Sequence, residues 1–368
     1  MWPYWILFLI PAIASFVSKP VQSVREDGTR TIKISAVWFL VMITLALMIG
    51  LRDRVGGDWF NYFRDLFEAE FLTFAEAIRQ PDPSYKIINI ISVNMGLGIV
   101  GVNLFCGFVF SLGLVIYSLS MPRPWLALTV AIPYMTIVVS MGYSRQGVAL
   151  GFAMIGLVAL SRKRLLWFVF WIFLGATFHR SAVILVCIPL LTLNFRELRN
   201  VPVILVVAFL MFTALLEGKT DNLTEQYLTQ KMQSDGALVR ILMNTIPALL
   251  FLALRKRMNI PRGQRQIYSI MSFFSIISLV AVISKIIPST ALDRMNLYFI
   301  PLQVFVFSSL PDSLARMQIH KQTIIFLIIL FYTAALFVWL NFANFSHWWL
   351  PYRMFPPLDI QEAYDMQR

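Results

Sequence analysis

Long stretches of the chain contain no charged side chain. Asp, Glu, Lys and Arg are absent from residues 34–51, 87–122, 124–144, 266–284 and 322–352. A helix that crosses a bilayer needs about 20 predominantly apolar residues. The pattern therefore predicts an all-α polytopic membrane protein with about twelve transmembrane helices. These helices are expected at residues 2–18, 34–51, 101–120, 125–142, 146–161, 165–178, 181–195, 201–216, 238–254, 267–285, 295–310 and 323–342.

The composition excludes several other classes of protein. Apolar residues make up 58% of the chain and charged residues 14%, whereas soluble domains are usually about 45–50% apolar and about 25% charged. An ordinary cytosolic enzyme, a disordered chain and a disulfide-rich secreted module are excluded. Cys106 and Cys187 both lie in apolar runs, so we interpret them as small buried hydrophobic residues. No metal site is predicted.

Basic residues concentrate on one predicted side of the membrane. The connections on that side hold 17 Lys or Arg and 4 Asp or Glu, and the rest of the chain holds 14 and 15. They are residues 19–33, 121–124, 161–164, 195–200, 255–266 and 311–322. Short basic loops stay in the cytoplasm. We therefore expect a multi-pass membrane protein with both termini on the non-cytoplasmic (periplasmic) side. The net charge of +12 then reflects topology and anionic lipid, and nucleic acid is not an expected partner.

The predicted extramembrane parts lie on the periplasmic side. The whole chain, residues 1–368, is expected to form a single integral membrane domain. Residues 52–86 form a periplasmic loop with an interfacial helix, and residues 343–368 form a periplasmic tail. We interpret residues 85–98 as a re-entrant or interfacial helix, because a full extra span there would reverse the sidedness of every later loop. The helix count around 85–120 stays open.

Three arginines are expected at the periplasmic N-terminal ends of helices. They are Arg145, Arg180 and Arg294. A cation at a helix N-terminus is repelled by roughly 0.3–1 kcal/mol, but an anion bound among such groups makes the placement favourable. A phosphate-bearing lipid head group fits this requirement. Arg52 and Arg54 reach the same face from the second span. The alternative is that these arginines only anchor helix ends at the membrane surface.

Two residues are candidates for acid–base chemistry. Asp58 follows two glycines that permit a backbone turn, and its carboxylate can accept a proton from a sugar hydroxyl or hold an arginine. Tyr62 offers a flat surface of the kind on which sugar rings stack. His179 stands beside Arg180 and titrates near neutral pH, as a general base requires. The alternatives are an aromatic belt with a capping Asp and a histidine that caps a helix.

Taken in order, these motifs resemble those of the EpsG/Wzy family of bacterial polysaccharide polymerases over most of the chain. The matching residues are Arg52, Val55, Gly56, Asp58 and Tyr62 in the early loop; Arg145-Gln146 before a helix of small residues; Phe178-His179-Arg180-Ser181; Asp293-Arg294 ahead of Tyr298-Phe299; and Trp349-Leu350-Pro351-Tyr352-Arg353 near the end.

The resemblance implies a GT-C-like, multi-span glycosyltransferase of the bacterial inner membrane, without a cofactor. Its donor and acceptor would be oligosaccharide repeats on undecaprenyl diphosphate, and a chain-length regulator and a flippase are possible partners. We assign Arg52, Arg145 and Arg294 to the diphosphate, and either His179 or Asp58 as the base. The remaining candidates are assigned to substrate binding: Arg54, Tyr62, Tyr143, Gln146, Arg180, Asp293 and Arg353.

Two other functions fit the same architecture. An O-antigen ligase or related lipid-dependent glycosyltransferase would pass finished polymer to a final acceptor. A flippase for lipid-linked oligosaccharides would move repeats across the membrane. The resemblance favours a polymerase, and loss of a polymerase would leave single-repeat glycans. Loss of a ligase leaves untransferred polymer, and loss of a flippase leaves repeats trapped on the cytoplasmic side.

Overall fold

The computed structural model describes residues 1–20, 32–192, 236–258, 260–285, 287–315 and 318–355. Within these residues the chain is helical, with one isolated β-bridge between Arg52 and Met354. The elements are α1 (Trp2–Val17), α2 (Ala36–Gly50), α3 (Trp59–Ala69), α4 (Phe74–Ile78), α5 (Pro83–Asn94), α6 (Gly98–Leu119), α7 (Pro124–Ala131), the π-helix η1 (Ile132–Ser140), α8 (Ser144–Ser161), α9 (Leu165–Phe178), the 3₁₀ helix η2 (Arg180–Val186), α10 (Cys187–Thr192), α13 (Ala237–Leu254), α14 (Arg262–Ser284), α15 (Ser289–Asn296), η5 (Leu297–Phe299), α16 (Ile300–Leu314), α17 (Lys321–Phe342) and η7 (Ser346–Trp348).

The arrangement of apolar helices is that of a multi-pass membrane protein. Six helical runs in the described residues are long and apolar enough to cross a membrane, and five shorter apolar runs accompany them. The long runs are Gly98–Leu119, Ser144–Ser161, Ala237–Leu254, Arg262–Ser284, Ser289–Leu314 and Lys321–Phe342. Each of these eleven runs overlaps a span predicted from the sequence. The predicted span at 201–216 lies outside the described residues.

Small residues allow the central helices to approach one another closely. A Cβ atom built on Gly113 of α6 would lie 2.2 Å from the carbonyl oxygen of Gly151 on α8. A Cβ on Gly107 of α6 would lie 2.9 Å from the carbonyl oxygen of Ala46 on α2. Membrane helices pack in this way because lipid gives little hydrophobic force to hold them together. Helix α6 therefore forms the centre on which α2 and α8 pack.

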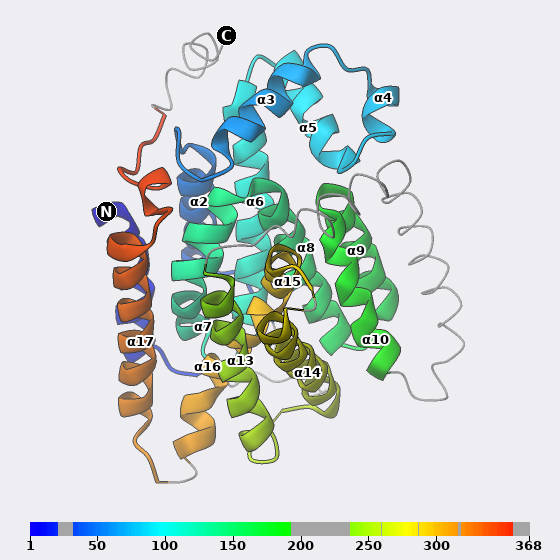
Figure 1. Ribbon diagram of the computed structural model, residues 1–368. Helices are drawn as coiled ribbons and strands as arrows, with labels where there is room; N and C mark the ends of the chain where they lie inside the picture. The colour runs from blue at the N-terminus through cyan, green and yellow to red at the C-terminus, as the bar shows by residue number, and fades with distance from the viewer. Residues whose placement is uncertain (21–31, 193–235, 259, 286, 316–317, 356–368) are drawn as a thin grey trace.

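Helices α3, α4 and α5 form a cap at one end of the bundle (Figure 1). The last turns of α13 and α16 and the first turns of α14 and α17 lie at the opposite end (Figure 1). Helix α5 packs against α3 and α4 and continues almost directly into α6. Residues 85–98 thus contribute to the cap at the end of the bundle.

The C-terminal segment returns to the cap end and fixes the loop between α2 and α3. The amide of Phe355 donates to the carbonyl of Leu51 at 2.7 Å, and the amide of Gly56 donates to the carbonyl of Trp348 at 2.9 Å. We call residues 51–57 together with 348–355 the tail–loop clasp. The Tyr4 hydroxyl of α1 donates to the Trp349 carbonyl at 2.8 Å. The start of the chain, the clasp and the cap therefore lie at the same end.

Candidate functional site

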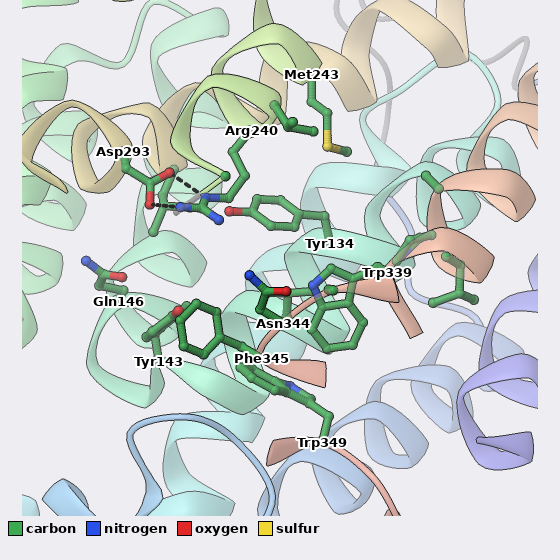
Figure 2. A pocket seen from close by; sticks show the side chains of 18 of the residues that line it. Tyr134, Tyr143, Gln146, Arg240, Met243, Asp293, Trp339, Asn344, Phe345 and Trp349 are labelled. Atoms are coloured by element: carbon green, nitrogen blue, oxygen red, sulfur yellow. Dashed lines mark hydrogen bonds and ion pairs between the residues drawn. The ribbon is translucent and has the colours of Figure 1, made fainter. Parts of the chain in front are cut away.

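A cavity of about 770 Å³ opens beneath the cap, between the clasp and helices α13, α15 and α17. One side of it is polar and the other apolar (Figure 2). The polar side is lined by Asp58, Tyr62, Tyr134, Tyr143, Arg145, Gln146, His179, Arg240, Asp293 and Arg294. The apolar side comes mainly from α17, and Trp339, Phe345 and Trp349 add aromatic rings where α17 meets the clasp. Most of the candidates from the sequence therefore surround one space.

A glycine turn brings Asp58 to this cavity. Gly56 has φ +113°, and a Cβ atom there would lie 2.4 Å from the Met141 carbonyl oxygen. Only glycine fits this backbone without strain. Asp58 then precedes the first residue of α3. Burial raises the pKa of its carboxyl above the ordinary value, while the guanidinium groups of Arg145 and Arg294 oppose that rise.

His179 lies in the turn between α9 and η2, where its ring is held on both sides. Its Nδ1 is 2.5 Å from the Ser181 hydroxyl, and its Nε2 is 3.3 Å from the side-chain nitrogen of Gln146. The Ser181 hydroxyl in turn donates to the Tyr298 hydroxyl at 3.4 Å. Burial lowers the pKa of His179 well below its ordinary value, and the nearby arginines add to that effect, led by Arg294. The imidazole is therefore neutral at neutral pH, the form that accepts a proton.

Arg145 opens helix α8, as the sequence predicts, and two carboxylates hold its guanidinium group. Its Nη1 lies 3.3 Å from Asp82 and 3.9 Å from Asp65. The group also lies over the rings of Tyr62 and Tyr85, at 5.5 Å from each centroid. These contacts keep Arg145 at the edge of the cavity. Neither carboxylate is predicted from the sequence as a partner of Arg145, because both stand far from Arg145 in the chain.

The structure corrects the expected position of Arg294. The prediction that it begins a descending helix is wrong, because α15 starts at Ser289, directly after Pro288, and Arg294 lies in its last turn. Proline favours a helix start at this place. Within the continuous run Ser289–Leu314, Arg294 lies beyond the first turn, and the effect of the helix dipole falls off within that turn, so the dipole argument for a bound anion does not apply here. Arg294 nevertheless lines the cavity.

Asp293 forms an ion pair with a residue that the sequence analysis did not select. Arg240 on α13 donates to both carboxylate oxygens of Asp293, at 2.7 and 2.8 Å (Figure 2). Arg240 lies in the first turn of its helix. The criterion that selected Arg145, a basic residue at the N-terminal start of a helix at the predicted periplasmic end, also applies to Arg240 and would have identified it.

Arg52 stands behind the cavity and makes structural contacts. It is 1% exposed. Its guanidinium group donates to the side chains of Asn103 at 2.9 Å and Ser144 at 2.6 Å, and to the carbonyls of Val55 and Ile49. This arrangement joins α2, α6 and α8 at the base of the clasp. The residue next to Arg145 in the chain, Ser144, is thereby fixed.

Three further predicted residues do not line the cavity. Arg54 is exposed and lies 3.9 Å from Asp53 within the clasp. Arg353 is also exposed, and its carbonyl accepts the Asp53 amide at 3.0 Å. Arg180 is partly buried beside the cap, where it lowers the pKa of Asp82 against the larger, opposite effect of burial. None of these three guanidinium groups shares the space beneath the cap with His179.

The fold and the cavity together define a class of protein. They form a helical membrane protein whose cavity joins arginines, carboxylates, a neutral imidazole and aromatic rings. In the described part of the chain, no three His, Cys, Asp or Glu side chains gather in a way that could hold a metal ion. Such a cavity suits acid–base chemistry on an anionic substrate with apolar and ring-shaped parts.

The comparison with known families agrees with this class. The EpsG family matches residues 35–354, and the chain belongs to this family of Wzy-type polysaccharide polymerases. No curated protein and no solved structure matches the chain. The matched range includes the cap, all of the clasp except Phe355, and every residue described above as lining the cavity.

Proposed function

We propose that this protein joins oligosaccharide repeats that are carried on undecaprenyl diphosphate, at the periplasmic face of the bacterial inner membrane. Membership of the EpsG family supports a polysaccharide polymerase. The observation that carries the finer proposal is the shared cavity, which holds His179, Asp58, Arg145 and Arg294 together. A base and cations around one cavity meet the needs of a glycosyl transfer from a lipid diphosphate.

The reaction forms one bond and breaks another. A hydroxyl oxygen of the acceptor repeat attacks the anomeric carbon of the donor sugar, and its proton passes to His179 Nε2 or to the Asp58 carboxylate. The bond between the anomeric carbon and the phosphate oxygen breaks, and undecaprenyl diphosphate leaves with the electron pair. Arg145 and Arg294 offset the negative charge that develops on this leaving group. One preorganised donor of this kind lowers the activation barrier by about 3–4 kcal/mol.

The aromatic residues at the clasp give the sugars a binding surface. Tyr143, Phe345 and Trp349 lie close together at one side of the cavity, with Trp339 nearby (Figure 2). The Trp349 ring is fixed, because its indole nitrogen donates to the Ile137 carbonyl at 2.8 Å. A rigid aromatic wall binds sugar rings at little entropic cost. The same cavity is lined by His179 and Asp58, the two candidates for the base.

Purified protein in lipid nanodiscs, supplied with a synthetic undecaprenyl-diphosphate-linked repeat, tests the proposal. We expect a ladder of products on a gel, spaced by one repeat. The variant Arg145→Gln should leave the single repeat unreacted, and Arg64→Gln, which changes an arginine of α3 that does not line the cavity, should not. A wild-type protein that is folded, binds the substrate and produces no ladder would contradict the proposal. Transfer of preformed polymer to a different acceptor would instead identify a ligase.

A further inference from the structure

Helix α17 presents two different faces along its length. One face is buried in the bundle through Ile325, Ile328, Tyr332, Leu336 and Leu340. A second face lines the cavity, and its residues recur at helical spacing of three and four positions. They are Phe331, Ala334, Ala335, Val338 and Phe342. The two alanines leave a shallow place in the middle of this second face.

The side of the cavity opposite α17 is formed by the first turns of α13. Gly236, Val239, Arg240 and Met243 line it, again at helical spacing. Val239 is 62% exposed and Phe342 on α17 is 71% exposed. These two side chains line the cavity and also face the outside of the molecule. Among the described residues, the cavity therefore opens sideways between α13 and α17, toward the hydrocarbon that surrounds membrane helices.

A charged pair marks the inner end of this apolar opening. Arg240 holds Asp293 through two hydrogen bonds, and the Tyr134 hydroxyl points toward the Arg240 guanidinium group (Figure 2). Arg294 follows Asp293 in α15 and also lines the cavity. Among the described residues at this end, Arg240 and Arg294 contribute two guanidinium groups and Asp293 one carboxylate. This end of the opening is complementary to a negatively charged head on a long apolar chain.

We propose that the polyprenyl chain of the lipid-linked substrate lies in the opening between α13 and α17, and that its diphosphate displaces Asp293 from Arg240. The inference rests on the function proposed above and adds the site of the lipid. A diphosphate offers the same bidentate partner as a carboxylate but carries more negative charge, so it competes well for a guanidinium group. Asp293 thus holds Arg240 in place until the substrate arrives.

The site is tested by the binding of undecaprenyl diphosphate to the purified protein, with undecaprenol and inorganic pyrophosphate as probes for the tail and the head alone. Ala334→Trp fills the opening and should weaken binding of undecaprenyl diphosphate and undecaprenol at least tenfold, with pyrophosphate unchanged. Leu330→Trp is the matched control, because Leu330 is an exposed residue of α17 that does not line the cavity. Ala334→Leu gives a smaller obstruction if the tryptophan lowers the melting temperature.

Two further variants test the head of the site. Arg240→Gln should weaken undecaprenyl diphosphate and pyrophosphate at least tenfold and leave undecaprenol unaffected. Asp293→Asn removes the competing carboxylate, so it should tighten pyrophosphate binding, which a pair that merely joins α13 to α15 would not do.

Specific results would overturn this inference. Wild-type affinity for undecaprenyl diphosphate in folded Ala334→Trp would exclude the opening as the lipid site. Equal displacement of undecaprenyl diphosphate by phosphatidylglycerol would make the opening a general lipid surface. The outcome is separate from that of the polymerase assay. Binding with this pattern and no ladder contradicts only the polymerase, and a ladder with an unaffected Ala334→Trp contradicts only the lipid site.

Discussion

The side-chain nitrogen of Gln146 lies 3.3 Å from Nε2 of His179 at the wall of the cavity. An amide N–H that donates to Nε2 requires the ring proton on Nδ1, which then donates to the Ser181 hydroxyl at 2.5 Å. The ring is thereby fixed with its lone pair toward the cavity. An acceptor hydroxyl that replaces the Gln146 amide meets a base already in the correct orientation.

This geometry predicts the pH dependence of polymerisation. Burial and the neighbouring arginines lower the pKa of His179 well below its ordinary value of 6.5, so its neutral, basic form persists below pH 6.5. We expect the acid limb of the rate to lie below pH 6.5. His179→Gln should reduce the rate at least about 100-fold, the typical contribution of a general base. Ladder formation measured between pH 5 and pH 8 checks both expectations.

His347→Gln is the control for this experiment, because His347 is exposed in η7 and does not line the cavity. An acid limb above pH 6.5, or an unchanged limb in His179→Gln, would exclude His179 as the base. The same shift affects folding: the unfolded chain binds more protons than the folded chain below pH 6.5, so stability falls as the pH decreases. His179→Gln should lessen that loss.

Asp58 and Asp53 provide a matched pair of carboxylates on one loop. Asp58 lines the cavity, whereas Asp53 lies in the clasp beside Arg54. Asp58→Asn should therefore reduce the rate of chain extension at least about 100-fold if its carboxylate is the base. Asp53→Asn keeps the backbone amide that joins the clasp and should retain most of the activity. Rates of ladder formation at equal protein concentration, with melting temperatures, distinguish the two.

The sequence predicts the spans well because a membrane helix needs only a continuous apolar stretch. The range 165–178 coincides with α9, and 323–342 falls within α17. The residues of the site are also found where a local signal exists. Arg145 stands alone between two charge-free stretches, and Gly56 and Gly57 mark the turn before Asp58.

The sequence cannot predict the pairs that depend on tertiary packing. Arg240 and Asp293 are 53 positions apart, and Asp82 meets Arg145 across 63. No local pattern indicates either contact. The motif that Arg52 shares with Asp58 predicts a contact with the substrate. The close approach of α2, α6 and α8 instead places Arg52 behind the cavity wall. A motif thus identifies the residues of a site without separating those that touch the cavity from those that position it.

Substitution of Arg52 should reduce the stability of the protein strongly, whereas substitution of Arg54 should hardly change it. Arg52→Ala removes a buried group that satisfies two side chains and two carbonyls, so we expect a loss of stability on the order of 3 kcal/mol. Arg54→Ala changes an exposed side chain and should stay within about 0.5 kcal/mol of the wild type. Chemical unfolding in detergent checks both values.

A direct role of Arg52 at the diphosphate would give a different result. Arg52→Lys would then weaken the binding of undecaprenyl diphosphate by the folded fraction of the protein. If Arg52 positions the clasp and Ser144, the folded fraction keeps its affinity and only the melting temperature falls. Affinity measured at a temperature well below the transition separates these two roles.

Gly56 and Gly57 test how strictly the clasp fixes Asp58. A Cβ at Gly56 would lie 2.4 Å from the Met141 carbonyl oxygen in a backbone with φ +113°, whereas a Cβ at Gly57 would meet only the Trp349 ring at 3.7 Å. Gly56→Ala should therefore lose roughly 1–3 kcal/mol of stability and most of its activity, because relief of the clash moves Asp58 from the cavity. Gly57→Ala makes an ordinary contact and should resemble the wild type. Equal behaviour of the two variants, in unfolding and in ladder formation, would show that the turn at Gly56 does not control the position of Asp58.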